Sequence, residues 1–120
     1  MVSFLVNSGA KTSAITEKEA TIMGIDCSSL PYAKGESIGF GGFFRNRNIN
    51  REVIVTFKSN QDEHRMKFGS FRVNCVPPNL TGEEREKLIR LTPNVLGMDI
   101  LRVFKIYLDT NRVELTLPEK

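Results

Sequence analysis

The stretch that most restricts this 120-residue chain is Phe4–Ala10, where an apolar run leads directly into a small polar turn. The run Phe4-Leu5-Val6 favours a buried strand. Asn7 and Ser8 then stand where the strand ends and the chain must bend. Gly9 can adopt backbone angles that other residues avoid, and it lets a second backbone or a ligand approach closely. The stretch therefore predicts a turn that presents polar groups at the end of a strand.

A glycine-rich segment, Gly39–Phe43 (Gly-Phe-Gly-Gly-Phe), lies between two β-like runs within residues 32–56. This composition predicts a hairpin whose tip opens and closes, because glycines permit unusual backbone angles and resist ordering. A phosphate-binding loop is the rival interpretation. It is disfavoured because no lysine follows at the required place and both flanks are strands.

Strand patterns also fill the middle and the end of the chain. Apolar and polar residues alternate over Arg51–Phe57, as in a half-buried strand. The run His64–Val76 alternates as well, but its phase slips at Gly69-Ser70, which predicts a bulge within one strand. Further strands are expected at Val95–Gly97, Lys105–Leu108 and Val113–Leu117, the last two joined by a turn at Asp109–Arg112.

The first expected helix spans Glu17–Met23. Thr16 and Glu19 fit a capping box, in which each side chain satisfies a free amide at the start of the helix. Ala20 and Met23 are expected to face inward.

A second, amphipathic helix is expected over Thr81–Leu91, with Leu88 and Leu91 on one apolar face. Its acidic residues come early and its basic residues late, which suits the helix dipole. Asp99 is expected to cap a short third helix over Ile100–Phe104, which is a structural role and not a catalytic one.

Length and charge place the chain in an ordinary globular class, with one domain expected over residues 1–120. The net charge of +3 is spread along the chain, so nucleic acid is not expected as a partner. A weaker alternative is nucleic-acid binding through Arg45, Arg47 and Arg51, which otherwise form a solvated hairpin face. No apolar run suits a membrane span and no signal peptide is visible, so no membrane partner and a cytoplasmic location are expected.

The two cysteines, Cys27 and Cys75, lie far apart and without the spacing of metal ligands. They are expected to be free thiols in a reducing compartment, with a disulfide between them as the open alternative. The single histidine, His64, has no nearby Cys or His partner, so no metal site and no cofactor are expected.

Three segments, in order along the chain, resemble the retropepsin-like aspartic proteases. Phe4–Ala10 is similar to the family's apolar strand followed by Asp-Thr/Ser-Gly-Ala, with Asn7 at the Asp position. Gly39–Phe43 resembles the family's flap, Gly-Ile-Gly-Gly-Phe. Val95–Leu101 resembles its segment of two hydrophobic residues, Gly, any residue, Asp/Asn, a hydrophobic residue and Leu. The ending, Lys105–Asp109 followed by Val113–Leu115, looks more like the cellular DNA-damage-inducible retropepsins than the viral ones.

The resemblance implies a mostly β fold: a closed, barrel-like acid-protease half-domain with a flap hairpin and two or three short helices. The strand or hairpin that precedes the catalytic loop in this family is expected to be missing or shortened. The resemblance also implies hydrolysis of peptide bonds by a symmetric homodimer with one catalytic Asp per chain.

The resemblance also assigns the site residues. The catalytic loop is expected at Asn7, Ser8 and Gly9, and an extended peptide is expected to bind as an added strand. The residues expected to contact this peptide are Ala10, Lys11, Thr12, Ala14, Gly39, Phe40, Gly41, Gly42 and Val95.

Asn7 conflicts with the implied activity, because a neutral amide cannot act as a general base. The chain as written is therefore expected to be an inactive protease that still folds, dimerises and binds peptide. Two explanations stay open. An experimenter replaced the Asp with Asn, or the chain is a natural pseudo-protease that serves as a peptide-binding or dimerisation module.

Overall fold

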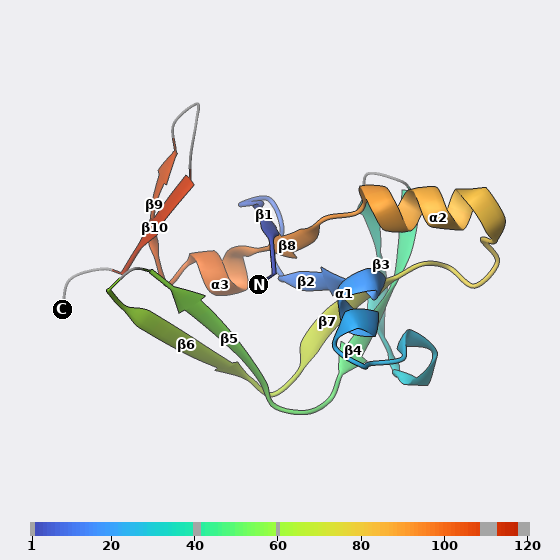
Figure 1. Cartoon of the computed structure of the whole chain (residues 1–120), viewed down its shortest axis with the longest axis horizontal. Coiled ribbons are helices and arrows are strands. Elements are labelled where there is room, and N and C mark those ends of the chain that lie inside the picture. Colours follow the sequence, from blue (N-terminus) through green and yellow to red (C-terminus); the bar gives the residue numbers. More distant parts are fainter. Residues whose placement is uncertain (1, 40–41, 60, 109–112, 118–120) are drawn as a thin grey trace.

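The computed structural model describes residues 2–39, 42–59, 61–108 and 113–117, and strands dominate it (Figure 1). The molecule measures 48 × 34 × 25 Å along its principal axes. The expected mostly β class with a few short helices is confirmed.

The main sheet has six strands: β1 (Phe4–Val6), β2 (Ala14–Thr16), β3 (Tyr32–Gly39), β4 (Gly42–Ile49), β7 (Phe71–Cys75) and β8 (Asn94–Leu96). Their order across the sheet is β1-β8-β2-β7-β4-β3. Two neighbouring pairs, β1 with β8 and β2 with β7, run parallel, and the other three pairs run antiparallel. Since the described pairings leave β1 and β3 at opposite edges, the barrel-like closure stays a prediction.

The core lies where β7 crosses the middle of this sheet. Phe71, Val73 and Cys75 are buried while the residues between them are only half-buried, which is the period of two that a strand imposes. These side chains pack in one cluster with residues from the neighbouring strands and from the C-terminal part of the chain, namely Ile15, Ile49, Leu96, Ile100 and Leu101.

Helix α1 (Glu17–Ile22) starts where the sequence predicts. The Thr16 hydroxyl accepts a hydrogen bond from the Glu19 amide at 3.2 Å, which is one half of the expected capping box. The Thr16 amide donates instead to Asn94 Oδ1 at 2.8 Å, so a distant strand supplies the second half. Ala20 is buried as expected, but the inward position predicted for Met23 is wrong. Met23 follows the last helical turn and is 53% exposed.

Helix α2 spans Gly82–Leu91. Leu88 is buried against Val76, but Leu91 is 51% exposed, so the apolar face predicted from this pair is wrong at the helix end. Helix α3 (Met98–Leu101) begins two residues earlier than predicted. Asp99 therefore lies inside the first turn and does not precede it.

The bulge predicted at Gly69-Ser70 is wrong. The chain leaves one sheet at that point and enters another, since β6 (Glu63–Phe68) pairs with β5 (Val53–Lys58) in a separate two-stranded sheet, whereas β7 belongs to the main sheet. Figure 1 shows the β5–β6 hairpin reaching away from the main sheet. A change of phase and a change of sheet give the same local pattern, because both reverse which face is buried.

The expectation of free thiols is also wrong, and the alternative holds. A disulfide joins Cys27 to Cys75 across a sequence separation of 48 residues, with a Cα–Cα distance of 6.4 Å. It ties the short 3-10 helix η1 (Cys27–Ser29) to the end of β7.

A last two-stranded sheet pairs β9 (Lys105–Leu108) with β10 (Val113–Thr116), as the sequence predicts. The turn expected at Asp109–Arg112 lies outside the described residues. Within the described part of the chain, every helix is too short or too polar to cross a bilayer.

Candidate active site

The predicted catalytic loop leaves the end of β1 as a tight, exposed turn. The Asn7 amide donates to the carbonyl of Leu96 at 3.0 Å, which anchors the start of the loop on β8. The Ala10 amide donates back to the Asn7 carbonyl at 3.1 Å and closes the turn. The Gly9 amide donates to Asn7 Oδ1 at 2.9 Å, so the side-chain oxygen points into the loop. Asn7, Ser8 and Gly9 are all solvent-exposed in the single chain.

The second half of this loop is shaped by the segment that enters α3. The Met98 amide donates to the Ala10 carbonyl at 2.7 Å, and the Asp99 amide donates to the Lys11 carbonyl at 3.1 Å. A Cβ atom at Gly97 would lie 2.8 Å from the Ala10 carbonyl oxygen and from the Thr12 carbonyl carbon. Glycine is therefore required at position 97 by the approach of another backbone.

Ser13 and Asp99 form a buried connection between the two segments. Ser13 is 1% exposed, and its amide and hydroxyl both donate to Asp99 Oδ1, at 2.9 and 2.6 Å. The Gly97 amide donates to the Ser13 hydroxyl at 2.8 Å, and the Ile100 amide donates to the same Asp99 oxygen at 2.9 Å. This carboxylate is committed to holding the loop, in line with the structural role expected for it.

Sequence reasoning did not single out Ser13. A small polar residue three positions after the Asn7-Ser8-Gly9-Ala10 stretch is its only local signal, and such residues are common in turns. Its role becomes visible only when Asp99, 86 residues away, is placed beside it.

The structure groups some of the expected peptide-binding residues and separates others. Ala14 pairs with Val95 across β2 and β8, directly after the loop. Ala14 is only 3% exposed, whereas Lys11 is exposed and Thr12 and Val95 are half-buried. In one chain, therefore, Lys11, Thr12 and Val95 are the more accessible members of this group.

The predicted flap is the hairpin of β3 and β4, in which Gly39 pairs with Gly42. Phe40 and Gly41, expected at its tip, lie outside the described residues. Because β3 is at the opposite edge of the main sheet from β1, the hairpin and the Asn7 loop come from the two ends of the sheet (Figure 1).

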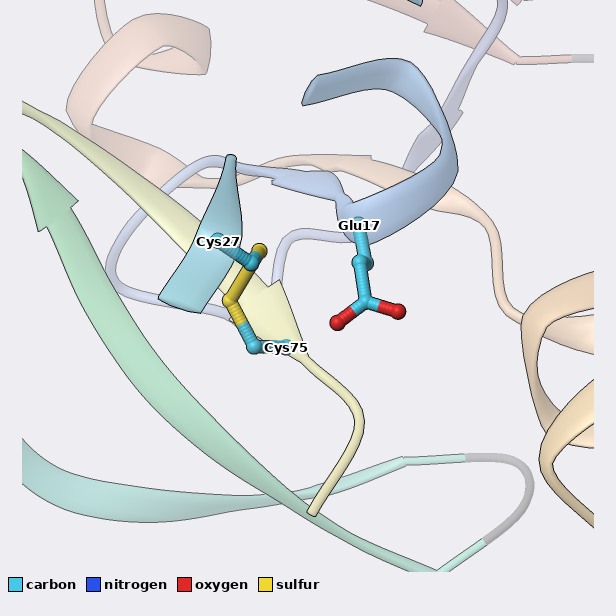
Figure 2. Close-up of side chains that lie close together, drawn as sticks. All are labelled: Glu17, Cys27 and Cys75. Carbon is cyan, nitrogen blue, oxygen red and sulfur yellow. A yellow bond between two sulfur atoms is a disulfide. The ribbon is translucent and has the colours of Figure 1, made fainter. Parts of the chain in front are cut away.

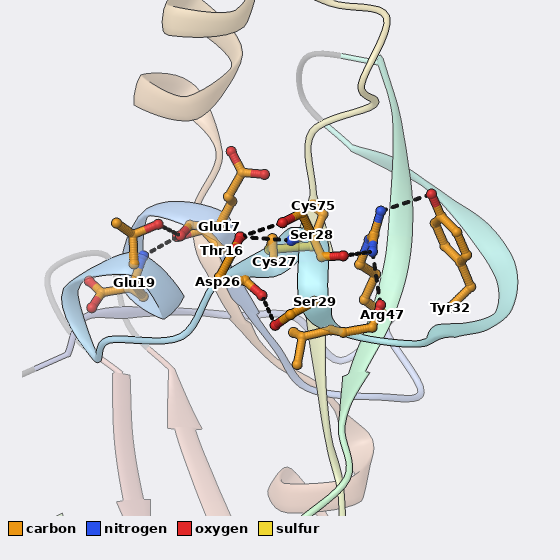
Figure 3. Close-up of a disulfide and its surroundings, with 12 residues drawn as sticks. Thr16, Glu17, Glu19, Asp26, Cys27, Ser28, Ser29, Tyr32, Arg47 and Cys75 are labelled. Atoms are coloured by element: carbon orange, nitrogen blue, oxygen red, sulfur yellow. Dashed lines mark hydrogen bonds between the residues drawn. A yellow bond between two sulfur atoms is a disulfide. The ribbon is translucent and has the colours of Figure 1, made fainter.

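Arg47, one of the basic residues considered for nucleic-acid binding, is engaged in contacts within the protein. The Arg47 guanidinium donates to the carbonyl of Leu30 at 2.8 Å and to the hydroxyl of Tyr32 at 2.8 Å, and it stacks 4.1 Å from the Tyr32 ring centroid (Figure 3). A guanidinium held in this way serves the hairpin base and would have to break these contacts to bind a phosphate.

The fold is similar to that of retropepsin-like aspartic proteases. One solved structure that matches is the crystal structure of a retropepsin-like aspartic protease from Rickettsia conorii, with a TM-score of 0.54 and 21% sequence identity. The match covers 92% of this chain and 76% of that chain. No protein-family profile and no curated protein sequence matches. The structural likeness establishes a protease-type fold, and the Asn7 loop belongs to that fold.

Proposed function

We propose that this chain forms one half of an aspartic endopeptidase site and that a symmetric homodimer completes it. The observation that carries the proposal is the Asn7 loop. In a retropepsin-like fold, Asn7 stands at the end of β1, is anchored on β8 and accepts a hydrogen bond from Gly9. A two-fold axis beside this exposed loop would bring two copies of position 7 together.

Peptide hydrolysis at such a site needs an acid at position 7 in each chain. Two neighbouring carboxylates cannot both ionise easily, so they share one proton and titrate as a pair. The ionised carboxylate takes a proton from water while the protonated one polarises the scissile carbonyl. Asn7 offers an amide in place of both functions, so the protein as written is expected to be inactive.

The substrate class that fits is an extended peptide bound as an added strand. Lys11 and Thr12 follow the loop and would offer backbone groups to the peptide. The hairpin of β3 and β4 would close over the opposite side of the peptide. Val95 would contribute to an apolar side-chain pocket together with Ala14, its partner across β2 and β8. Ala10, Gly39, Phe40, Gly41 and Gly42 complete the proposed set.

The test is the Asn7→Asp variant, assayed on a mixed peptide library from acidic to neutral pH. Cleavage is expected in the variant and not in the parent protein, because general acid–base catalysis alone contributes about 10²–10⁴-fold. Asn7→Ala is the matched control, since it changes the same position without adding an acid. Mass spectrometry of the parent protein must show that deamidation has not already converted Asn7 to an aspartate. No cleavage by a folded Asn7→Asp dimer would refute the protease proposal.

A second candidate is a natural pseudo-protease that binds peptides without cutting them. It is compatible with the Gly9 to Asn7 Oδ1 hydrogen bond, because the loop reaches its shape with an amide at position 7. The parent protein should then bind, without cleavage, the same peptides that Asn7→Asp cuts. Peptide binding by calorimetry separates the two candidates from a chain that does neither.

A cytoplasmic location stays part of the proposal. In that reducing compartment Cys27 and Cys75 would exist largely as thiols, although the structure joins them. The redox state of this pair therefore becomes a question that bears on the chemistry of the protein.

A further inference from the structure

Three ligand-type side chains meet away from the Asn7 loop, at the junction of α1, η1 and β7 (Figure 2). A carboxylate oxygen of Glu17 and the sulfurs of Cys27 and Cys75 all lie within 4.8 Å of one another. Cys27 is 7% exposed and Cys75 is 2% exposed, and Glu17 is half-buried. The two cysteines are 48 residues apart, so only the fold brings this donor set together.

We propose that reduction of the Cys27–Cys75 disulfide converts this cluster into a binding site for a thiophilic divalent cation of the zinc class. A dithiol or a phosphine supplies the two electrons that break the sulfur–sulfur bond, and each sulfur gains a proton. The cation then displaces both thiol protons to solvent and binds two thiolates and the Glu17 carboxylate. The site and the disulfide are thus alternative links between the same two segments.

The geometry suits tetrahedral coordination. Zinc binds thiolates at about 2.3 Å and carboxylate oxygens at about 2.0–2.2 Å, so two sulfurs on one ion lie about 3.8 Å apart. The Cα atoms of Cys27 and Cys75 are already 6.4 Å apart, and the Glu17 oxygen lies within 4.8 Å of both sulfurs. Small side-chain rotations after reduction would bring the three donors onto one ion.

The charges also favour a divalent cation. Arg85 forms an ion pair with Oε2 of Glu17, which leaves Oε1 of the same carboxylate for a metal. Two thiolates and one carboxylate are neutralised in full by one divalent ion together with the Arg85 guanidinium. A neutral assembly matters here because unpaired charge at buried positions is costly. Thiolate donors select zinc over the oxygen-loving magnesium and calcium ions.

A cavity beside the three donors would leave the fourth coordination position to water. A cavity of about 230 Å³ is lined by both cysteines and Glu17, and also by Asp26, Arg47, Pro78 and Arg85. Asp26 also lines this cavity, but it lies outside the group of donors within 4.8 Å of one another, and its Oδ1 accepts hydrogen bonds from the amide and hydroxyl of Ser28, at 3.0 and 2.8 Å (Figure 3). The arrangement of three protein donors and one open position is that of a site that can take up a small ligand.

The experiment uses the full chain, reduced with a phosphine under anaerobic conditions and titrated with Co²⁺. The phosphine takes up one oxygen atom from water as the disulfide gains two protons, and the oxidised phosphine has no thiol to compete for metal. The reduced protein is expected to bind one Co²⁺ with a sulfur-to-cobalt charge-transfer band, which Zn²⁺ then abolishes. The oxidised protein is expected to show no such band.

Glu17→Gln is the decisive variant, because it keeps the disulfide and can be checked for folding in the oxidised form. Loss of this donor is expected to weaken binding by about tenfold or more. Glu19→Gln, on the same helix, is the matched control and should bind as the parent does. Cys75→Ser should lose the charge-transfer band.

Three results would overturn the proposal. These are a reduced, folded protein without the band, equal affinities for Glu17→Gln and Glu19→Gln, or a chain that unfolds on reduction and is not restored by Zn²⁺. Any of them would leave the disulfide as a structural link only. Because none of these measurements uses peptidase activity, the outcome is independent of the proposed protease function.

Discussion

A few backbone contacts decide the shape of the Asn7 loop. The loop is held by backbone hydrogen bonds to Leu96, Met98 and Asp99, so its geometry depends more on its neighbours than on the side chain at position 7. The backbone of Ala10 and Thr12 also passes close to Gly97. The backbone angles of Gly97, −100° and −173°, are open to any residue. The requirement for glycine there is therefore one of space.

We expect Gly97→Ala to destabilise the protein by about 1–3 kcal/mol, because its methyl group must displace the backbone at Ala10 and Thr12. Gly69→Ala is the control, since a Cβ there meets nothing within 4 Å. Urea denaturation of both variants gives the two free energies of unfolding. Equal midpoints for the two alanines would show that the loop moves freely away from Gly97.

At the scale of elements, η1 is a short helix held at its start by one carboxylate. Asp26 caps it, and the hydrogen bonds from the side chain and then from the backbone of Ser28 lower the pKa of the Asp26 carboxyl below its usual value of 3.8. The folded state therefore prefers the ionised form. Its contribution to stability is present above pH 3.8 and is lost as the pH falls through the lower pKa of the folded protein.

NMR titration of Asp26 is expected to give a midpoint below 3.8, and Ser28→Ala should raise it. The neighbouring Ser29 hydroxyl donates to the backbone carbonyl of Asp26 and not to its carboxylate. Ser29→Ala should therefore leave the midpoint where it is. A parallel rise in both variants would mean that general loosening of η1, and not the carboxylate hydrogen bond, sets the pKa.

Elements with a strong local signal were predictable from sequence, and their surroundings were not. The alternation in β5, the Thr16 cap and the final β9–β10 pair follow from neighbouring residues, and the structure shows all three. The break between β6 and β7 does not follow from the sequence, because a bulge and an exit from the sheet produce the same phase slip.

The parts of the site that escaped prediction are those made by residues far apart in the chain. Nothing in the sequence around Ser13 indicates Asp99, and nothing around Cys27 indicates Glu17. A turn motif can be recognised locally, but the groups that hold it in place depend on which strands become neighbours.

At the scale of the whole molecule, the proposed function requires two chains and the described structure contains one. The β9–β10 pair forms its own two-stranded sheet and stands apart from the main sheet in Figure 1. Because it pairs with no strand of the main sheet among the described residues, we propose this pair as the site of association.

Mixing experiments test the dimer through activity. If each site needs one acid from each chain, the parent protein should inhibit Asn7→Asp by forming mixed dimers. When the two proteins are mixed in equal amounts and assemble at random, half of the Asn7→Asp chains pair with a parent chain. The activity per Asn7→Asp chain is therefore expected to fall about twofold. Sedimentation of the parent at micromolar concentration should show a dimer. A persistent monomer would contradict the assembly.

The disulfide is expected to contribute to global stability. It closes a long loop, and links of this kind typically stabilise a small protein by about 2–4 kcal/mol. Urea denaturation with and without a phosphine reductant, in the presence of a chelator, measures the contribution. Identical curves would show that the disulfide does not change the free energy of unfolding.

The hydrogen bonds between Ser13 and Asp99 also set an order of events during folding. The two residues are separated by 86 positions, and Gly97 and Met98 touch the same loop from a similar distance along the chain. Contacts between residues so far apart in the chain form only after the entropic cost of closing the intervening loop has been met. During synthesis the segment from Phe4 to Ser13 leaves the ribosome early. Its hydrogen-bonding partners are missing until the segment around Asp99 has also been made. The Asn7 loop should therefore be among the last parts of the molecule to take its final form.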